Sequence, residues 1–157
     1  MTTNAGTLFL VVVAGHLLIG CGEEAAQHRA VQLAPDNARI VASGEKIYGD
    51  HCASCHGVDL EGQPNWRARD GEGFLPAPPH DHTGHTWHHS DQHLFELTKH
   101  GLQAFAGADY KSRMPLYKDV LSDQQIIDVL SFIKSRWPQT IRQRHDQLNR
   151  AAAKHAN

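Results

Sequence analysis

The sequence predicts an all-α domain of three to four helices joined by long loops. Three segments carry apolar residues at helical spacing, with capping residues at their ends. No segment shows a strong alternation of apolar and polar residues, the pattern of a β-strand. A segment rich in glycine and proline, residues 57–89, separates the first two helices. A loop of this length in a small domain is unusual unless it wraps around something.

The bulk composition limits the class of protein. The chain has 157 residues, enough for one domain with tails, and a formal net charge of -2 at pH 7. Because it is this close to neutral, we expect no nucleic-acid partner. Histidine is the unusual feature, with 13 residues in the chain, and six of them fall within HDHTGHTWHHSDQH, residues 80–93.

The N-terminal residues have the features of an export signal. Residues 8–19, LFLVVVAGHLLI, form a mostly apolar run that is too short to span a bilayer and suits the core of a signal peptide. LIGC, residues 18–21, resembles the lipobox of bacterial lipoproteins, in which the cysteine is lipidated and becomes the new N-terminus. We therefore expect a signal peptide over residues 1–20 and a lipid anchor at Cys21. The alternative is an ordinary cysteine behind a leader that is cleaved elsewhere or not at all, since MTTNAGT contains no Lys or Arg.

A polar segment and the first helix follow this signal. The segment from Cys21 to residue 37 is polar, rich in alanine and ends in a Pro-Asp-Asn turn signal, which predicts a tether between the membrane and the domain. The domain is expected over residues 38–137, and its first helix over residues 39–51. Gly44 lies inside that helix, where glycine costs about 1 kcal/mol relative to alanine, so we expect another backbone to approach closely there.

The second predicted helix covers residues 91–100. Ser90 is placed to cap its start, and Gly101 stands where a helix commonly ends in a left-handed residue. Leu94, Phe95 and Leu97 supply its buried side.

The third predicted helix has the strongest signals. Ser122 and Gln125 form a capping box, apolar residues follow at helical spacing, and Pro138 comes just after the last of them. Residues 138–157 are rich in basic residues and carry only a thin apolar stripe. We expect them to form a polar tail, a frayed helix rather than a docking helix.

Residues 52–56 read CASCH, and the C-x-x-C-H pattern is the attachment motif of c-type haem. Cys52 and Cys55 lie about a turn apart, so each can add to one of the two haem vinyl groups, and His56 then reaches the iron. A thioredoxin-like redox pair would be accompanied by a βαβ pattern, and a zinc site would need a second C-x-x-C; the chain shows neither. The sequence therefore predicts one covalent haem c per chain.

With this motif the sequence resembles the small monohaem class I c-type cytochromes, over about residues 38–137. GEKIYGDHCASCHG, residues 44–57, resembles the family's first helix and haem motif. RMPLY, residues 113–117, resembles its distal ligand loop, and LSDQQIIDVLSFIKS, residues 121–135, its last helix. The resemblance implies a cytochrome c-like fold wrapped around the haem, with the first and last helices crossing at Gly44. It also implies that Tyr48 packs near Leu130 and Ile133.

The resemblance further implies the second iron ligand. The family uses a methionine, and Met114 is the single methionine that remains once Met1 leaves with the signal peptide. The iron ligands implied are therefore His56 and Met114. The alternatives are that Met114 is a buried core residue, or that a histidine of residues 80–93 takes its place on the iron.

The surroundings of the haem are predicted only as sets of candidates. In the family a proline carbonyl accepts a hydrogen bond from the proximal histidine, and FLPAPPH offers Pro76, Pro78 and Pro79. The candidate donors to the haem propionates are Trp66, Arg67 and Trp87, which can equally be residues of loop packing and surface charge.

His/Met ligation leaves no open position on the iron, which favours electron transfer over chemistry on a substrate. We expect a single-electron carrier, not an enzyme, that serves redox partner proteins at the periplasmic or extracellular face of a bacterial membrane. Two alternatives stay open. One is a peroxidase-like or nitrogen-oxide-reacting haem enzyme with Met114 displaced; the other is a metal-handling or sensing protein that uses residues 80–93. Within that segment the pairs His85/His88, His85/His89 and His89/His93 have ligand-like spacing, although a solvent-facing polar loop is the simpler interpretation.

Overall fold

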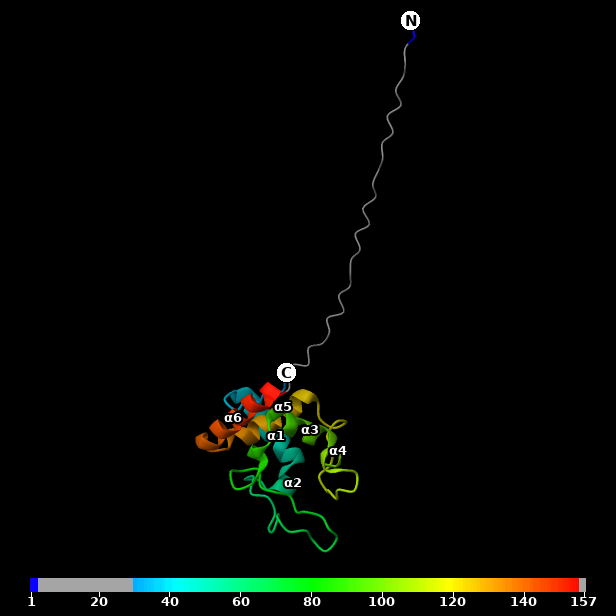
Figure 1. The fold of residues 1–157 in the computed structure, drawn as a ribbon. Coiled ribbons are helices and arrows are strands. Elements are labelled where there is room, and N and C mark those ends of the chain that lie inside the picture. The colour runs from blue at the N-terminus through cyan, green and yellow to red at the C-terminus, as the bar shows by residue number, and fades with distance from the viewer. Residues whose placement is uncertain (3–29, 156–157) are drawn as a thin grey trace.

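A computed structural model of the chain describes residues 1–2 and 30–155 (Figure 1). The expected signal peptide and the expected lipid site at Cys21 lie outside these residues, except for Met1 and Thr2. The described part contains helices and no β-strand, so the prediction of an all-α fold is confirmed. Its elements are α1 (Ala38–His51), α2 (Ala53–His56), the 3-10 turn η1 (Thr86–His88), α3 (Asp91–His100), α4 (Gln103–Ala106), α5 (Asp123–Ser135) and α6 (Gln139–His155). None of these described helices combines the length and the apolar character needed to cross a membrane.

The crossing of α1 and α5 is the framework of the domain. A Cβ atom on Gly44 would overlap the backbone carbonyl of Asp128, so only glycine allows α1 to approach α5 this closely. Beyond the crossing, Tyr48 of α1 packs against Phe132 of α5 with ring centroids 5.4 Å apart. Tyr48 belongs to one buried apolar core together with Leu130 and Ile133. The helix crossing implied by the family resemblance is therefore present, and Tyr48 shares the core with Leu130 and Ile133.

The helix starts follow the capping chemistry of the sequence. The side chain of Ser90 accepts a hydrogen bond from the His93 amide at the start of α3. In α5 the Ser122 hydroxyl accepts from the Gln125 amide, and the Gln125 side chain accepts from the Ser122 amide, which completes the predicted capping box. Gly101 ends α3 with a φ of 81°, as its position predicts.

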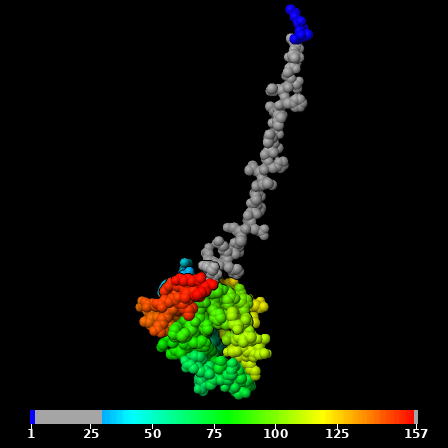
Figure 2. Space-filling view, viewed as in Figure 1, coloured from blue at the N-terminus to red at the C-terminus, as the bar shows by residue number. Residues whose placement is uncertain are grey.

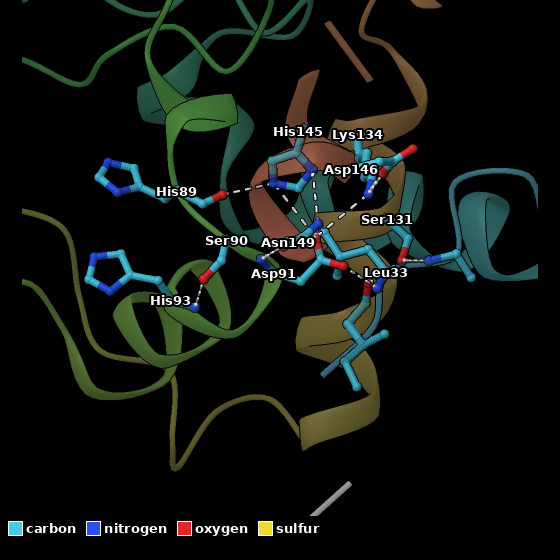
Figure 3. A network of polar contacts seen from close by, with 12 residues as sticks. Leu33, His89, Ser90, Asp91, His93, Ser131, Lys134, His145, Asp146 and Asn149 are labelled. Atoms are coloured by element: carbon cyan, nitrogen blue, oxygen red, sulfur yellow. Dashed lines mark hydrogen bonds and ion pairs between the residues drawn. The ribbon is translucent and has the colours of Figure 1, made fainter. Parts of the chain in front are cut away.

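The prediction of a frayed helix beyond Pro138 is wrong. Helix α6 docks on the domain, and its residue His145 is fully buried. The His145 Nε2 atom lies 2.8 Å from the carbonyl oxygen of His89, and Lys134 Nζ of α5 lies 2.7 Å from Asp146 Oδ1 (Figure 3). Because polar groups hold much of this interface, the thin apolar stripe of the helix did not indicate it.

The last residues of the predicted tether also belong to the domain. Leu33 is buried, and its amide donates a hydrogen bond of 2.9 Å to Asp91 Oδ2. The next amide, that of Ala34, donates to Ser131 Oγ at 3.0 Å. The chain is thus fixed to α3 and α5 several residues before α1 begins at Ala38.

Candidate haem-binding site

The C-x-x-C-H motif forms the short helix α2, which follows directly on α1. The amide of His56 donates to the carbonyl of Cys52 at 2.9 Å, so the motif is one closed helical turn. Cys52 and Cys55 are both free thiols on this turn. Burial raises the pKa of the Cys52 thiol to about 11, and Cys55 adds to the shift. Cys52 therefore stays protonated at neutral pH, unlike the reactive thiolates of C-x-x-C redox pairs.

The imidazole of His56 is buried and held in one orientation. Its Nδ1 atom lies 2.8 Å from the carbonyl oxygen of Pro78. A carbonyl can only accept, so Nδ1 carries the proton and Nε2 keeps its lone pair. Burial lowers the pKa of His56, and the Pro78 hydrogen bond opposes that shift only in part. The ring is thus neutral with Nε2 unprotonated, which is the form of histidine that can bind a metal ion.

The backbone of the long loop places Pro78 at this position. The Gln63 amide donates to the Ala77 carbonyl at 2.8 Å, and the Ala77 amide donates to the Gln63 side chain at 2.9 Å. The Gly62 amide donates a hydrogen bond to the His56 carbonyl at 2.7 Å. Of the three candidate prolines, Pro78 is the one that accepts from His56.

His80 completes this side of the site, and the sequence does not distinguish it from the other histidines of residues 80–93. Its ring stacks on that of His56 with centroids 3.9 Å apart and an interplanar angle of 22°. Burial lowers the pKa of His80 well below the ordinary value, and His56 and His85 add to the shift. The only signal in the sequence is the rigid Pro-Pro pair that precedes His80.

Met114 lies in the loop between α4 and α5 and packs, partly buried, against the apolar core. Tyr117 ties this loop to the end of α1, because its hydroxyl donates to the His51 carbonyl at 2.8 Å. Burial raises the pKa of Tyr117 to about 12, and the two cysteines contribute to the shift. The loop that carries Met114 therefore lies close to the cysteine motif, although the two are about sixty residues apart in the sequence.

Two loops are joined beside Met114 by an ionic clamp formed by Asp70, Glu72 and Arg113. The Arg113 guanidinium lies 2.6 Å from Asp70 Oδ2 and 2.7 Å from Glu72 Oε2. It also lies over the ring of Phe74, 3.9 Å from the centroid. The residue next to Met114 is thus bound to the long loop that follows the haem motif.

The candidate propionate donors make contacts with neighbouring residues of the loop. The Trp87 indole N–H donates to the His82 carbonyl at 3.3 Å. Trp66 stacks on His85 with centroids 5.4 Å apart, and the Arg67 guanidinium lies 4.1 Å from the Trp66 ring centroid. These contacts agree with the alternative interpretation of the three residues as loop packing.

Three other histidines of residues 80–93, His85, His89 and His93, form an aromatic row. His89 lies 5.7 Å from His85 and 5.0 Å from His93, measured between ring centroids. Burial lowers the pKa of His85 and of His89, and neighbouring histidines add to both shifts. Among residues 1–2 and 30–155, no three His, Cys, Asp or Glu side chains are arranged to hold a metal ion.

The residues around α2 fit haem c. Two free thiols stand one turn apart, a neutral imidazole presents Nε2, and a thioether lies on a loop fixed to the same region. Nitrogen and sulfur donors of these types are the ligands of c-type haem iron. Figure 2 shows the surface hollowed between the loop that follows α2, coloured teal to green, and the yellow-green segment that follows α3.

A family model described as cytochrome c matches residues 41–137. No curated protein and no solved structure matches the chain. The family match runs from the first turns of α1 to Trp137, and it includes the two cysteines, His56 and Met114. Because it spans more than half of the sequence, the chain belongs to the cytochrome c family, whose members bind haem covalently, typically with one haem per chain.

Proposed function

We propose that this protein is a single-electron carrier whose haem c is attached through Cys52 and Cys55 and ligated by His56 and Met114. Membership of the cytochrome c family supports a haem-binding electron carrier. The observation that carries the ligand assignment is the 2.8 Å hydrogen bond between His56 Nδ1 and the Pro78 carbonyl. It leaves Nε2 as the nitrogen of the ring whose lone pair is free to bind iron. His56 directly follows the second cysteine of the motif.

The haem supplies the one-electron Fe(III)/Fe(II) couple when it is bound. The residues of the chain contribute position and environment. Pro78 orients the proximal imidazole, while Tyr117 and the ionic clamp hold the loop of Met114 close to the cysteine motif. Ligation by the His56 imidazole and the Met114 thioether would leave the iron no open position for a substrate, so electrons would pass to partner proteins without a bound substrate.

The ligand assignment is tested by optical spectroscopy of the holo-protein. We expect the ferric wild type to show a low-spin spectrum with the weak long-wavelength charge-transfer band of thioether-ligated haem. Met114→Ala should lose that band, because no other thioether remains in the described domain. The matched control Leu116→Ala changes an exposed residue of the same loop and should keep the band. A wild type without the band and with a high-spin spectrum would favour the haem enzyme over the carrier. A low-spin spectrum without the band, or an unchanged Met114→Ala spectrum, would instead favour a histidine of residues 80–93 as the second ligand.

Covalent attachment is tested by intact mass. Replacing Cys52 and Cys55 with alanine should remove the haem mass from the denatured chain. Ser54→Ala, between the two cysteines, should leave it in place. Retention of the haem mass in the double variant would contradict attachment through these thiols.

We also propose that the carrier is exported and held by a lipid at Cys21. The support is the sequence alone: an apolar run over residues 8–19 that ends in LIGC. The mass of the mature N-terminus tests this proposal, since a lipidated chain begins at Cys21 and partitions into detergent. Cys21→Ser should abolish both properties, and an unmodified N-terminus in the wild type would refute the anchor.

A further inference from the structure

We propose that His80 is a positioning residue for the iron ligand His56, and that its stacked ring helps to set the reduction potential of the haem. The inference rests on the proposed function, because it takes His56 as the iron ligand. It concerns a histidine that belongs neither to the C-x-x-C-H motif nor to the methionine loop.

The first support is the contact between the two rings. Their centroids are 3.9 Å apart and their planes differ by 22°, which is a face-to-face stack. The Pro78 hydrogen bond fixes one nitrogen of His56 but leaves the ring free to turn about that bond. A second ring against its face blocks this rotation. Pro78 and His80 therefore constrain the edge and the face of the same imidazole.

The second support is the way in which His80 is itself fixed. Its Nδ1 atom lies 2.9 Å from the hydroxyl of Thr86, a buried residue of η1. Its amide donates to the Leu60 carbonyl at 2.8 Å, and its carbonyl accepts from the Trp137 indole at 2.7 Å. The ring and both backbone groups of His80 are thus held, so it can serve as a rigid platform.

The rigidity also comes from the local chain. Pro78 and Pro79 restrict the backbone directly before His80. A Cβ atom on Gly84 would overlap the Pro79 carbonyl, so the turn that follows packs tightly against the same peptide. The segment that accepts from His56 and the segment that stacks on it are therefore one unit.

The stack has an electronic consequence. A ligated imidazole carries more positive charge when the iron is ferric than when it is ferrous. A neutral aromatic face stabilises positive charge against it, so the His80 ring favours the ferric state. The orientation of the His56 ring plane would in turn affect the ferric EPR g values and the spread of the haem methyl resonances.

Four variants of the holo-protein test this inference. His80→Leu removes the ring, His80→Phe keeps an aromatic face without nitrogen atoms, and Thr86→Val releases the ring from its hydrogen bond. The matched control is His82→Leu, an exposed histidine of the same loop. The readouts are the reduction potential, the ferric EPR g values, and the spread of the haem methyl resonances in NMR.

We expect His80→Leu to raise the reduction potential and to change the g values and the methyl spread. His80→Phe should show a smaller change in the potential, and His82→Leu none. If His80→Leu prevents folding, the comparison of His80→Phe and Thr86→Val with the wild type decides the question by the same readouts.

Two outcomes overturn the inference, and they differ in what they say of the proposed function. A wild type that binds no haem at the C-x-x-C-H motif overturns the proposed function and this inference together. A haem-loaded wild type, whose potential, g values and methyl spread are the same in His80→Leu, overturns the role of His80 alone. Lower stability without any change in these readouts would show that His80 serves only in packing.

Discussion

Asp91 and Asn149 exchange two hydrogen bonds between the start of α3 and the middle of α6 (Figure 3). The Asp91 amide donates to Asn149 Oδ1 at 2.7 Å, and Asn149 Nδ2 donates to Asp91 Oδ1 at 2.9 Å. Asp91 is buried, and its other oxygen accepts from the Leu33 amide. One carboxylate thus joins the N-terminal segment, α3 and α6.

Removing the Asn149 side chain should therefore destabilise the domain. Asn149→Ala leaves the amide and one oxygen of a buried aspartate without these partners, which costs about 1–3 kcal/mol. Gln147→Ala, at an exposed position of the same helix, is the matched control and should change stability little. Denaturant unfolding measures both variants. If Asn149→Ala has the same free energy of unfolding as the wild type, the Asn149–Asp91 pair contributes no stability.

The two glycines of α1 should respond to alanine in opposite directions. Gly44→Ala places a methyl group on the Asp128 carbonyl and should lower the free energy of unfolding by at least about 1–3 kcal/mol. At Gly49 no atom lies within 4 Å of an added Cβ. Gly49→Ala should therefore stabilise the helix by about 0.5–1 kcal/mol. Thermal unfolding of the two variants tests the helix crossing directly, and a harmless Gly44→Ala would contradict it.

The ionic clamp should control access to the iron more than it controls stability. Arg113 is about half exposed, and exposed ion pairs contribute only about 0–1 kcal/mol each. Asp70→Asn combined with Glu72→Gln should therefore leave unfolding almost unchanged. It should free the loop next to Met114 and speed the binding of imidazole to ferric haem several-fold, as followed by stopped-flow absorbance.

The control for the clamp is Lys46→Gln, which breaks the exposed Lys46–Asp50 pair on α1. It removes an ion pair without touching either loop and should leave the binding rate of imidazole at its wild-type value. Equal rates in the clamp variant and in this control would show that the clamp does not restrain the methionine loop.

Stability should fall as the pH decreases from about 8 to about 5. Burial lowers the pKa of His145, and Lys134 adds to the shift, while Asp91, Asp146 and the His89 carbonyl oppose it. The unfolded chain then takes up the proton at the ordinary histidine pKa of about 6.5, above the folded value, so acid favours unfolding across that window. His85 and His89, whose pKa values are also lowered, act in the same direction.

His145→Gln should make this pH dependence shallower, because one of the depressed groups is gone. Urea unfolding at several pH values measures the slope, with Gln147→Ala as the control that keeps the wild-type slope. An unchanged slope in His145→Gln would mean that this imidazole is not held neutral by the fold.

The helices that could be predicted from sequence are those whose signals are local. Helices α3 and α5 begin where Ser90 and Ser122 cap them, because a cap and an apolar period lie within a few residues of each other. Helix α6 could not be recognised as a docking helix. Its partner Asp91 is 58 residues from Asn149 and buried, and nothing near Asn149 in the sequence indicates that contact.

In the candidate site, too, the features with local sequence signals could be predicted and those set by distant contacts could not. The sequence identifies Cys52, Cys55 and His56 because the motif is contiguous. It could not choose Pro78 among three prolines, since that choice depends on the pairing of Gln63 with Ala77 across the loop. Nor could it place the ring of His80 on His56, which requires the whole path of the loop.

The shared anchor at Asp91 brings together the two ends of the described domain, through Leu33 and Asn149. Helix α2 and the loop after it lie at the far end of the molecule from the C-terminus (Figure 1). A carrier attached to a bilayer upstream of residue 30 would therefore turn its cysteine motif away from the lipid. Its electrons would be exchanged with partners that approach from the aqueous side.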